Sequence, residues 1–180
     1  LQNLQVCRTE ADWADLALEI IGDLHLLVEA LFKLDDLPEP LQREVLVLSG
    51  VNLRKEQVLD EKAVEDYWLV IAQEFGEEDK LRSRRTWIWG EQLQQPALLL
   101  DFAWGGQPFD HRWEVGAAFS GEIVYYPLAY PLRALVKSFR MEQKPFSGPR
   151  GFPDLGHAFD HYRNALAANP WLYRFPLLLE

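Results

Sequence analysis

Two histidines four residues apart are the strongest candidates for chemistry in this 180-residue chain. His157 and His161 have the i, i+4 spacing that places two imidazoles on one face of a helix, as in helical two-histidine zinc sites. The intervening string, HAFDH, lacks the glutamate that serves as general base in such sites, and a metal would also need a third ligand. Phe159 and Tyr162 carry the apolar face of the predicted helix, so the histidines point mostly to the other side. We therefore predict no metal and no cofactor in this chain.

Other reactive side chains do not form a recognisable catalytic pattern. No serine lies in a GxSxG elbow, and Gly105-Gly106 lacks the Lys-Ser/Thr of a phosphate-binding loop. Cys7 is the only cysteine, which excludes an internal disulfide and any multi-cysteine zinc site within the chain. We expect that the chain is not an enzyme, and keep a hydrolase with an unrecognised site as the third hypothesis.

Asp101 is the most unusual polar residue, because it interrupts the apolar run LLLDFAW. A buried carboxylate needs a charged or hydrogen-bonding partner. Arg85 or Arg133 could supply it, and the pair would then lock two strands together. The alternative is a carboxylate with a functional role.

A basic and aromatic run offers a second reading, in which the chain binds nucleic acid. Arg82, Arg84 and Arg85 could contact phosphates while Trp87 and Trp89 stack on bases. Aromatic residues at a period of two are, however, more typical of a sheet core. Residues 1–79 carry 19 acidic and 6 basic side chains, which would repel a phosphate backbone, whereas residues 80–180 carry 9 acidic and 12 basic ones. We predict a protein partner first and nucleic acid as the alternative.

The hydrophobic pattern predicts an α+β fold. Apolar residues at three- and four-residue spacing indicate a helix over 9–34 with Thr9 as its N-cap, and shorter helices follow over 40–49 and 52–60. Alternating runs then predict an antiparallel sheet or small barrel of about five strands. These strands are expected at 67–75, 81–89, 96–104, 117–126 and 132–140. A loop and a final helix, which starts near Leu155 and is ended by Asn169-Pro170, complete the chain.

These elements group into a helical region 1–62, a β module 63–143 and a C-terminal region 144–180 that packs on the rest as one compact unit. No apolar run reaches the roughly 18 residues that span a membrane, so we expect no membrane association. The single cysteine fits a reducing cytosol, so we expect a cytoplasmic location. The chain opens on Leu1 and its only methionine is Met141, which suggests a piece of a longer protein.

Several strings of aromatic, glycine and proline residues resemble the C-terminal region of bacterial SWIM zinc-finger family proteins. The strings are DYWLV (66–70), RTWIWGE (85–91), LLLDFAWGGQPF (98–109), YYPLAYPLRALV (125–136) and NPWL (169–172). The zinc motif of that family lies upstream, and the single cysteine here cannot supply it. The resemblance implies a non-catalytic protein-interaction module, and its usual gene neighbours imply an assembly with a MoxR-type AAA ATPase and a von Willebrand A-domain protein.

Overall fold

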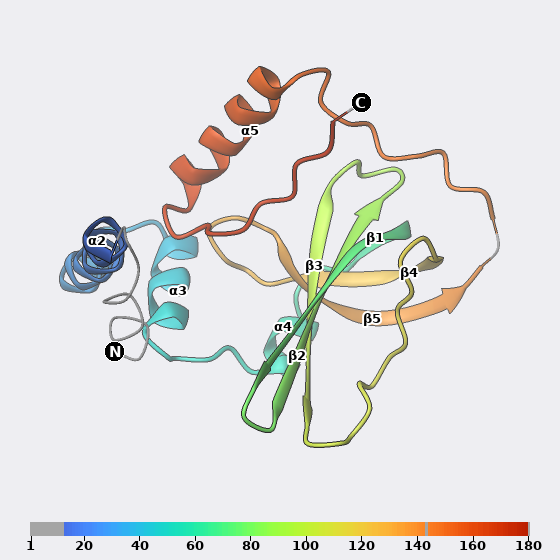
Figure 1. Ribbon diagram of the computed structural model, residues 1–180, viewed down its shortest axis with the longest axis horizontal. Coiled ribbons are helices and arrows are strands. Elements are labelled where there is room, and N and C mark those ends of the chain that lie inside the picture. Colours follow the sequence, from blue (N-terminus) through green and yellow to red (C-terminus); the bar gives the residue numbers. More distant parts are fainter. Residues whose placement is uncertain (1–12, 143, 180) are drawn as a thin grey trace. The chain divides into compact units, whose positions relative to one another are not determined.

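The computed structural model describes residues 13–142 and 144–179 (Figure 1). The contacts within the chain divide it into two compact units, Leu1–Asn52 and Leu53–Glu180. The first unit is shorter than the predicted helical region 1–62, because helix α4 (Lys55–Leu59) packs on strands β4 and β5 of the second unit. Each unit is described by itself.

The first unit consists of α2 (Trp13–Phe32), the short 3-10 helix η1 (Leu34–Asp36) and α3 (Glu39–Leu48). Pro38 precedes α3 with an extended backbone, and Gly50 follows it with a φ of 102°, a conformation that favours glycine. The helices predicted over 9–34 and 40–49 are thus confirmed where they are described; Thr9, its predicted N-cap, and Cys7 lie outside the described residues. No helix in the described part of the chain combines the length and apolar character needed to cross a membrane.

The second unit is built on a closed five-stranded barrel with the strand order β1-β2-β3-β5-β4. The strands are β1 (Val64–Glu78), β2 (Leu81–Gly90), β3 (Pro96–Trp104), β4 (Ala118–Tyr125) and β5 (Arg133–Met141). The long strand β1 pairs with β4 over residues 64–69 and with β2 over residues 68–78, so the two ladders overlap at Trp68 and Leu69. The prediction of an α+β chain with about five strands is confirmed.

One strand pairing differs from the antiparallel expectation. β3 and β5 run parallel through Leu98↔Arg133 and Leu99↔Ala134, and this pairing closes the barrel. The other four ladders are antiparallel. Local alternation predicts where strands lie but not which distant strands become neighbours, so the sequence could not show this closing contact.

The barrel interior is filled by inward-facing side chains from all five strands. Trp68, Ile88, Phe119 and Ile123 are fully buried there. Trp113, from the connection between β3 and β4, adds to this core, and its ring lies 4.8 Å from that of Phe119. The β3–β4 connection therefore contributes to the core as well as linking two strands.

The outside of the barrel is covered on two sides. Val58 of α4 packs against Val124 and Tyr126. On another side, Trp87 of β2 is buried with residues of helix α5 (Leu155–Ala168) and of the tail that follows it. Figure 1 shows the tail running between α5 and strand β3. Both faces of β2 are consequently apolar, one toward the barrel core and the other toward the C-terminal segment.

Candidate functional site

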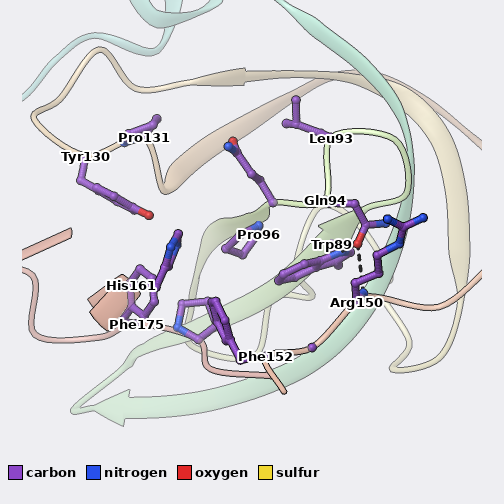
Figure 2. A pocket seen from close by; sticks show the side chains of 13 residues that line it. Trp89, Leu93, Gln94, Pro96, Tyr130, Pro131, Arg150, Phe152, His161 and Phe175 are labelled. Carbon is purple, nitrogen blue, oxygen red and sulfur yellow. Dashed lines mark hydrogen bonds between the residues drawn. The ribbon is translucent and has the colours of Figure 1, made fainter. Parts of the chain in front are cut away.

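A pocket of about 330 Å³ lies between the barrel and the C-terminal segment (Figure 2). Five stretches of chain line it: the end of β2, the β2–β3 turn with the start of β3, the β4–β5 connection, the loop before α5, and α5 with the tail. Its volume is at the lower end of the range usual for ligand pockets. The lining residues are Trp89, Leu93, Gln94, Gln95, Pro96, Tyr130, Pro131, Arg150, Gly151, Phe152, His161, Phe175 and Pro176.

The side chain of Gln94 holds two walls of this pocket together. Its Oε1 accepts hydrogen bonds from Trp89 Nε1 at 3.3 Å and from the backbone N–H of Arg150 at 3.0 Å (Figure 2). Its Nε2 donates to the carbonyl of Glu91 at 2.6 Å. The Glu91 carboxylate in turn accepts the backbone N–H of Ser147 at 2.7 Å, and this bond lowers the pKa of Glu91. The loop before α5 is therefore fastened to the β2–β3 turn, and the pocket is preformed.

The polar groups that face the pocket are few and carry no negative charge. Its lining contains no aspartate or glutamate, and Arg150 is its only permanently charged residue. The ring of His161 lies 5.2 Å from Phe152 and 5.5 Å from Phe175, so two aromatic rings flank it. Burial raises the pKa of Tyr130, which keeps its hydroxyl a neutral donor. Nothing in this lining pairs a nucleophile with a general base.

The predicted histidine pair does not converge on a common point. His157 Nδ1 lies 2.8 Å from Oδ2 of Asp154, the residue that caps the N-terminus of α5. His161, one turn further on, belongs to the pocket described above. Within residues 13–142 and 144–179, no group of three or more His, Cys, Asp or Glu side chains could hold a metal ion.

Asp101 forms an ion pair, but the sequence-based choice of partner was wrong. Its Oδ2 lies 2.7 Å from Nη2 of Arg84, not beside Arg85 or Arg133. Arg84 and Asp101 are directly opposite on β2 and β3 and share a face, whereas Arg85 points to the other face of β2. Arg133 instead stacks over the ring of Tyr126. The carboxylate is 22% exposed and the guanidinium 6%.

The residues proposed for nucleic-acid binding do not share one surface. Arg84 is buried in its ion pair, and Trp87 and Trp89 are each only 6% exposed. Arg82 donates to the carbonyl of Gln107 and lies over Phe109. Arg85 is half-buried on the opposite, outer face of β2.

Asp66 is a structural carboxylate that the sequence reading missed. It is 5% exposed, and it accepts backbone N–H groups from Tyr67, Gln92 and Leu93. It thereby ties the start of β1 to the β2–β3 turn beside the pocket. A carboxylate at the start of an alternating apolar run could have indicated this buried residue, just as the interrupted apolar run indicated Asp101.

Helix α2 in the first unit carries an apolar surface that is not buried. None of its twenty residues is buried, although the helix packs against α3. The sequence predicted one apolar stripe from Trp13 to Leu31. The structure shows that a second stripe lies next to it, formed by Leu18, Ile21, Val28 and Phe32, which are 70%, 55%, 39% and 82% exposed.

The barrel topology defines the class of fold. Five strands in this order, with β3 parallel to β5, are arranged like those of the oligonucleotide- and oligosaccharide-binding (OB) fold, a likeness of strand arrangement alone. No family model, curated protein or solved structure matches the chain. A fold of this class serves many functions, so function has to be argued from the surfaces themselves.

Proposed function

We propose that this chain is a non-catalytic protein-interaction module that docks through helix α2. The observation that carries the proposal is the exposure of large apolar side chains along a twenty-residue helix with no buried residue. A helix that is apolar around most of its circumference is ordinarily covered on several sides. Here α3 packs against α2 within the unit, and the second stripe remains exposed, as do parts of the first stripe such as Leu24 at 59%.

The spacing of that stripe fits recognition of a helix by a groove. Leu18, Ile21, Val28 and Phe32 follow one another at intervals of three, seven and four residues, so they lie along one side of α2. Amphipathic helices that bind in apolar grooves use anchors at this spacing. Burying one such aliphatic or aromatic side chain contributes about 1.5–3 kcal/mol.

Charge indicates the chemistry of the partner. α2 carries Asp15, Glu19, Asp23 and Glu29, while Lys33 follows just after its end. A second copy of the helix, laid alongside, would bring these carboxylates near one another. An apolar groove with lysine or arginine along its rim is the complementary surface. The resemblance to SWIM-type proteins suggests where this partner belongs. On that resemblance alone, we propose an assembly with a MoxR-type ATPase and a von Willebrand A-domain protein.

A matched pair of variants tests the proposal. Ile21→Gln changes the exposed stripe, whereas Leu26→Gln makes a comparable change at a 44% exposed position on a different side of α2. The tagged chain and both variants would be used to purify partners from the native cell. We expect Ile21→Gln to lose the partner by about tenfold or more, as burial of one such side chain implies, while Leu26→Gln retains it.

Two results would contradict this proposal. One is equal recovery of the partner by both variants, with melting temperatures unchanged. The other is that the unchanged chain recovers no specific partner.

A second function is favoured by one specific observation. Phe102 and Trp104 lie on the outer face of β3 and are 54% and 60% exposed, with Leu81 opposite Trp104 on β2. In OB folds, the face of strands β2 and β3 binds single-stranded nucleic acid or oligosaccharide, and this comparison is an analogy of fold only. Arg85 lies on the same outer face, so a smaller basic and aromatic surface exists there than the sequence predicted.

A further inference from the structure

The pocket of Figure 2 is a second binding surface, in a different unit from helix α2. Trp89, Tyr130, Phe152 and Phe175 supply aromatic walls from four separate stretches of chain. Trp89 is 6% exposed and is held by its hydrogen bond to Gln94, so this wall does not need to reorganise before binding. A preformed aromatic wall lowers the entropic cost of binding.

The volume of the pocket limits what can enter. About 330 Å³ accommodates one large side chain and some of its flanking backbone, but not a folded element. Aromatic walls favour an aromatic guest, because offset and edge-to-face ring pairs add to the energy of burial. Pro96, Pro131 and Pro176 also line the pocket, so its walls combine rigid prolines with aromatic rings, as do the grooves that bind extended peptides.

The charge at the rim of the pocket further limits which chemical class of ligand can bind. No hydrogen bond or ion pair involves the Arg150 guanidinium within the described part of the chain; Arg150 is an exposed residue that lines the pocket beside Gln94 and Trp89 (Figure 2). Four other arginines of this unit form ion pairs: Arg84 with Asp101, Arg112 with Glu114, Arg163 with Asp160, and Arg174 with Glu74. An unpaired arginine beside a lining without acidic residues is complementary to one carboxylate. A single permanent charge does not match the repeated phosphates of a nucleic acid.

We propose that this pocket binds an extended acidic peptide segment of a partner protein. An aromatic side chain of the peptide enters between Trp89 and Phe175, and a neighbouring aspartate or glutamate carboxylate pairs with Arg150. The Tyr130 hydroxyl and the Gln95 amide, both on the lining, can donate to peptide carbonyls. This inference rests on the proposed function in one respect, namely that the ligand belongs to a partner protein. The pocket itself is a separate surface to which α2 does not contribute.

Binding of short capped peptides would test the inference directly. The probes are Glu-Phe-Glu, its neutral analogue Gln-Phe-Gln and its truncated analogue Glu-Ala-Glu, titrated into the full chain while the indole N–H signals are followed by NMR. We expect Glu-Phe-Glu to shift the Trp89 signal saturably, and the other two peptides to bind at least about tenfold more weakly, since one charge-assisted hydrogen bond or one buried ring is lost.

Matched variants separate this site from non-specific attraction. Arg150→Gln should weaken Glu-Phe-Glu about tenfold, which is the loss of one charge-assisted hydrogen bond. Arg163→Gln removes an equally permanent charge from the exposed side of α5 and should leave binding unchanged. Melting curves of both variants would establish that the fold is intact.

Several outcomes would overturn the inference. One is equal affinity of the chain for the charged and neutral peptides, and another is an equal loss of peptide affinity in both arginine variants. Displacement of the peptide by an oligonucleotide, or saturation of the pocket by benzoate but by no peptide, would indicate a different ligand. The last is that no probe binds at millimolar concentration. Ile21→Gln should bind Glu-Phe-Glu normally. Failure at the α2 surface and failure at the pocket can therefore be told apart.

Discussion

Arg84 and Asp101 join neighbouring strands of the barrel by a charged pair directly across the β2–β3 ladder. Nε and Nη2 of Arg84 donate to the same carboxylate oxygen of Asp101, at 3.2 and 2.7 Å. Nη2 also donates to the backbone carbonyl of His111 at 2.7 Å. The guanidinium therefore holds together β2, β3 and the β3–β4 connection that brings Trp113 into the core.

The first prediction is that Asp101→Ala lowers the free energy of unfolding by about 2–4 kcal/mol. Removing one partner of a buried pair costs about 3–5 kcal/mol because it leaves a buried charge uncompensated, and the 22% exposure of Asp101 reduces that cost. Urea unfolding would measure it. Arg85→Ala is the control and should cost less than about 1 kcal/mol, since Arg85 makes no part of this pair. Equal losses in the two variants would contradict the assignment of Arg84 as the partner.

The sequence predicted an ion pair at Asp101 but assigned it to Arg85 or Arg133, and the structure shows Arg84 instead. An alternating strand identifies its core face when one face is apolar and the other polar. β2 breaks that rule, because Ile88 faces the barrel core while Trp87 is buried beneath the C-terminal segment. With both faces apolar, the pattern did not show whether Arg84 or Arg85 shares a side with Asp101.

The second prediction concerns Gly90, which ends β2 beside the buried carboxylate of Asp66. A Cβ at position 90 would lie 2.6 Å from Asp66 Oδ2 and 3.0 Å from the Trp68 ring. Gly90→Ala must therefore displace a carboxylate that accepts three backbone N–H groups, and we expect a loss of about 1–3 kcal/mol in unfolding free energy. Gly106→Ala is the control, because a Cβ there meets nothing within 4 Å. Equal melting temperatures for the two variants would refute this role of Asp66.

The pocket could be predicted only in fragments. Of its aromatic side chains, Trp89 lies in a predicted strand, whereas Tyr130, Phe152 and Phe175 lie in a predicted turn, a predicted loop and the tail. Their convergence depends on the β4–β5 connection and the tail, which are irregular segments without a periodic signal. His161 was noticed for its spacing from His157, and the structure places it against aromatic rings instead of near a shared ligand.

The third prediction is that the isolated chain holds no stoichiometric zinc. His157 is engaged by Asp154, and His161 lies between Phe152 and Phe175. A tight zinc site needs at least three protein ligands with set geometry. Elemental analysis after dialysis should give well under one zinc per chain. A tightly held equivalent that disappears in His157→Ala would refute the prediction.

The fourth prediction is a loss of order at the start of α5 in acid. The backbone N–H of His157 donates to Oδ1 of Asp154, and this bond lowers the pKa of that carboxyl from its ordinary 3.8. A carboxyl whose pKa is lower in the folded chain stabilises the fold above its unfolded pKa, and that stabilisation is lost as the pH falls through the folded value. The His157 amide resonance should move toward its unbonded position below about pH 4. Asp154→Asn keeps a capping side chain but cannot titrate, so an unchanged pH profile in that variant would contradict the assignment.

The fifth prediction is that the chain does not bind nucleic acid tightly. Three residues on the outer face of β2 and β3 favour nucleic-acid binding, namely Phe102, Trp104 and Arg85. Against them stand the formal net charge of −10 and the burial of Trp87 and Trp89, which removes most of the predicted stacking surface. Anisotropy titrations with mixed-sequence single- and double-stranded DNA and RNA at near-physiological salt should show no binding tighter than about 100 µM, the weak end of non-specific affinity.

The decisive variants for this prediction follow from the placement of the side chains. Trp104→Ala removes the most exposed ring of the face and Arg85→Ala its charge, whereas Arg112→Ala removes an 89% exposed charge elsewhere in the unit. Micromolar binding that weakens steeply with salt would reverse the order of the two proposed functions if the first two variants abolish it and the third does not. Binding reduced equally by the two arginine variants but not by Trp104→Ala would indicate non-specific attraction to basic residues, because base stacking depends on Trp104.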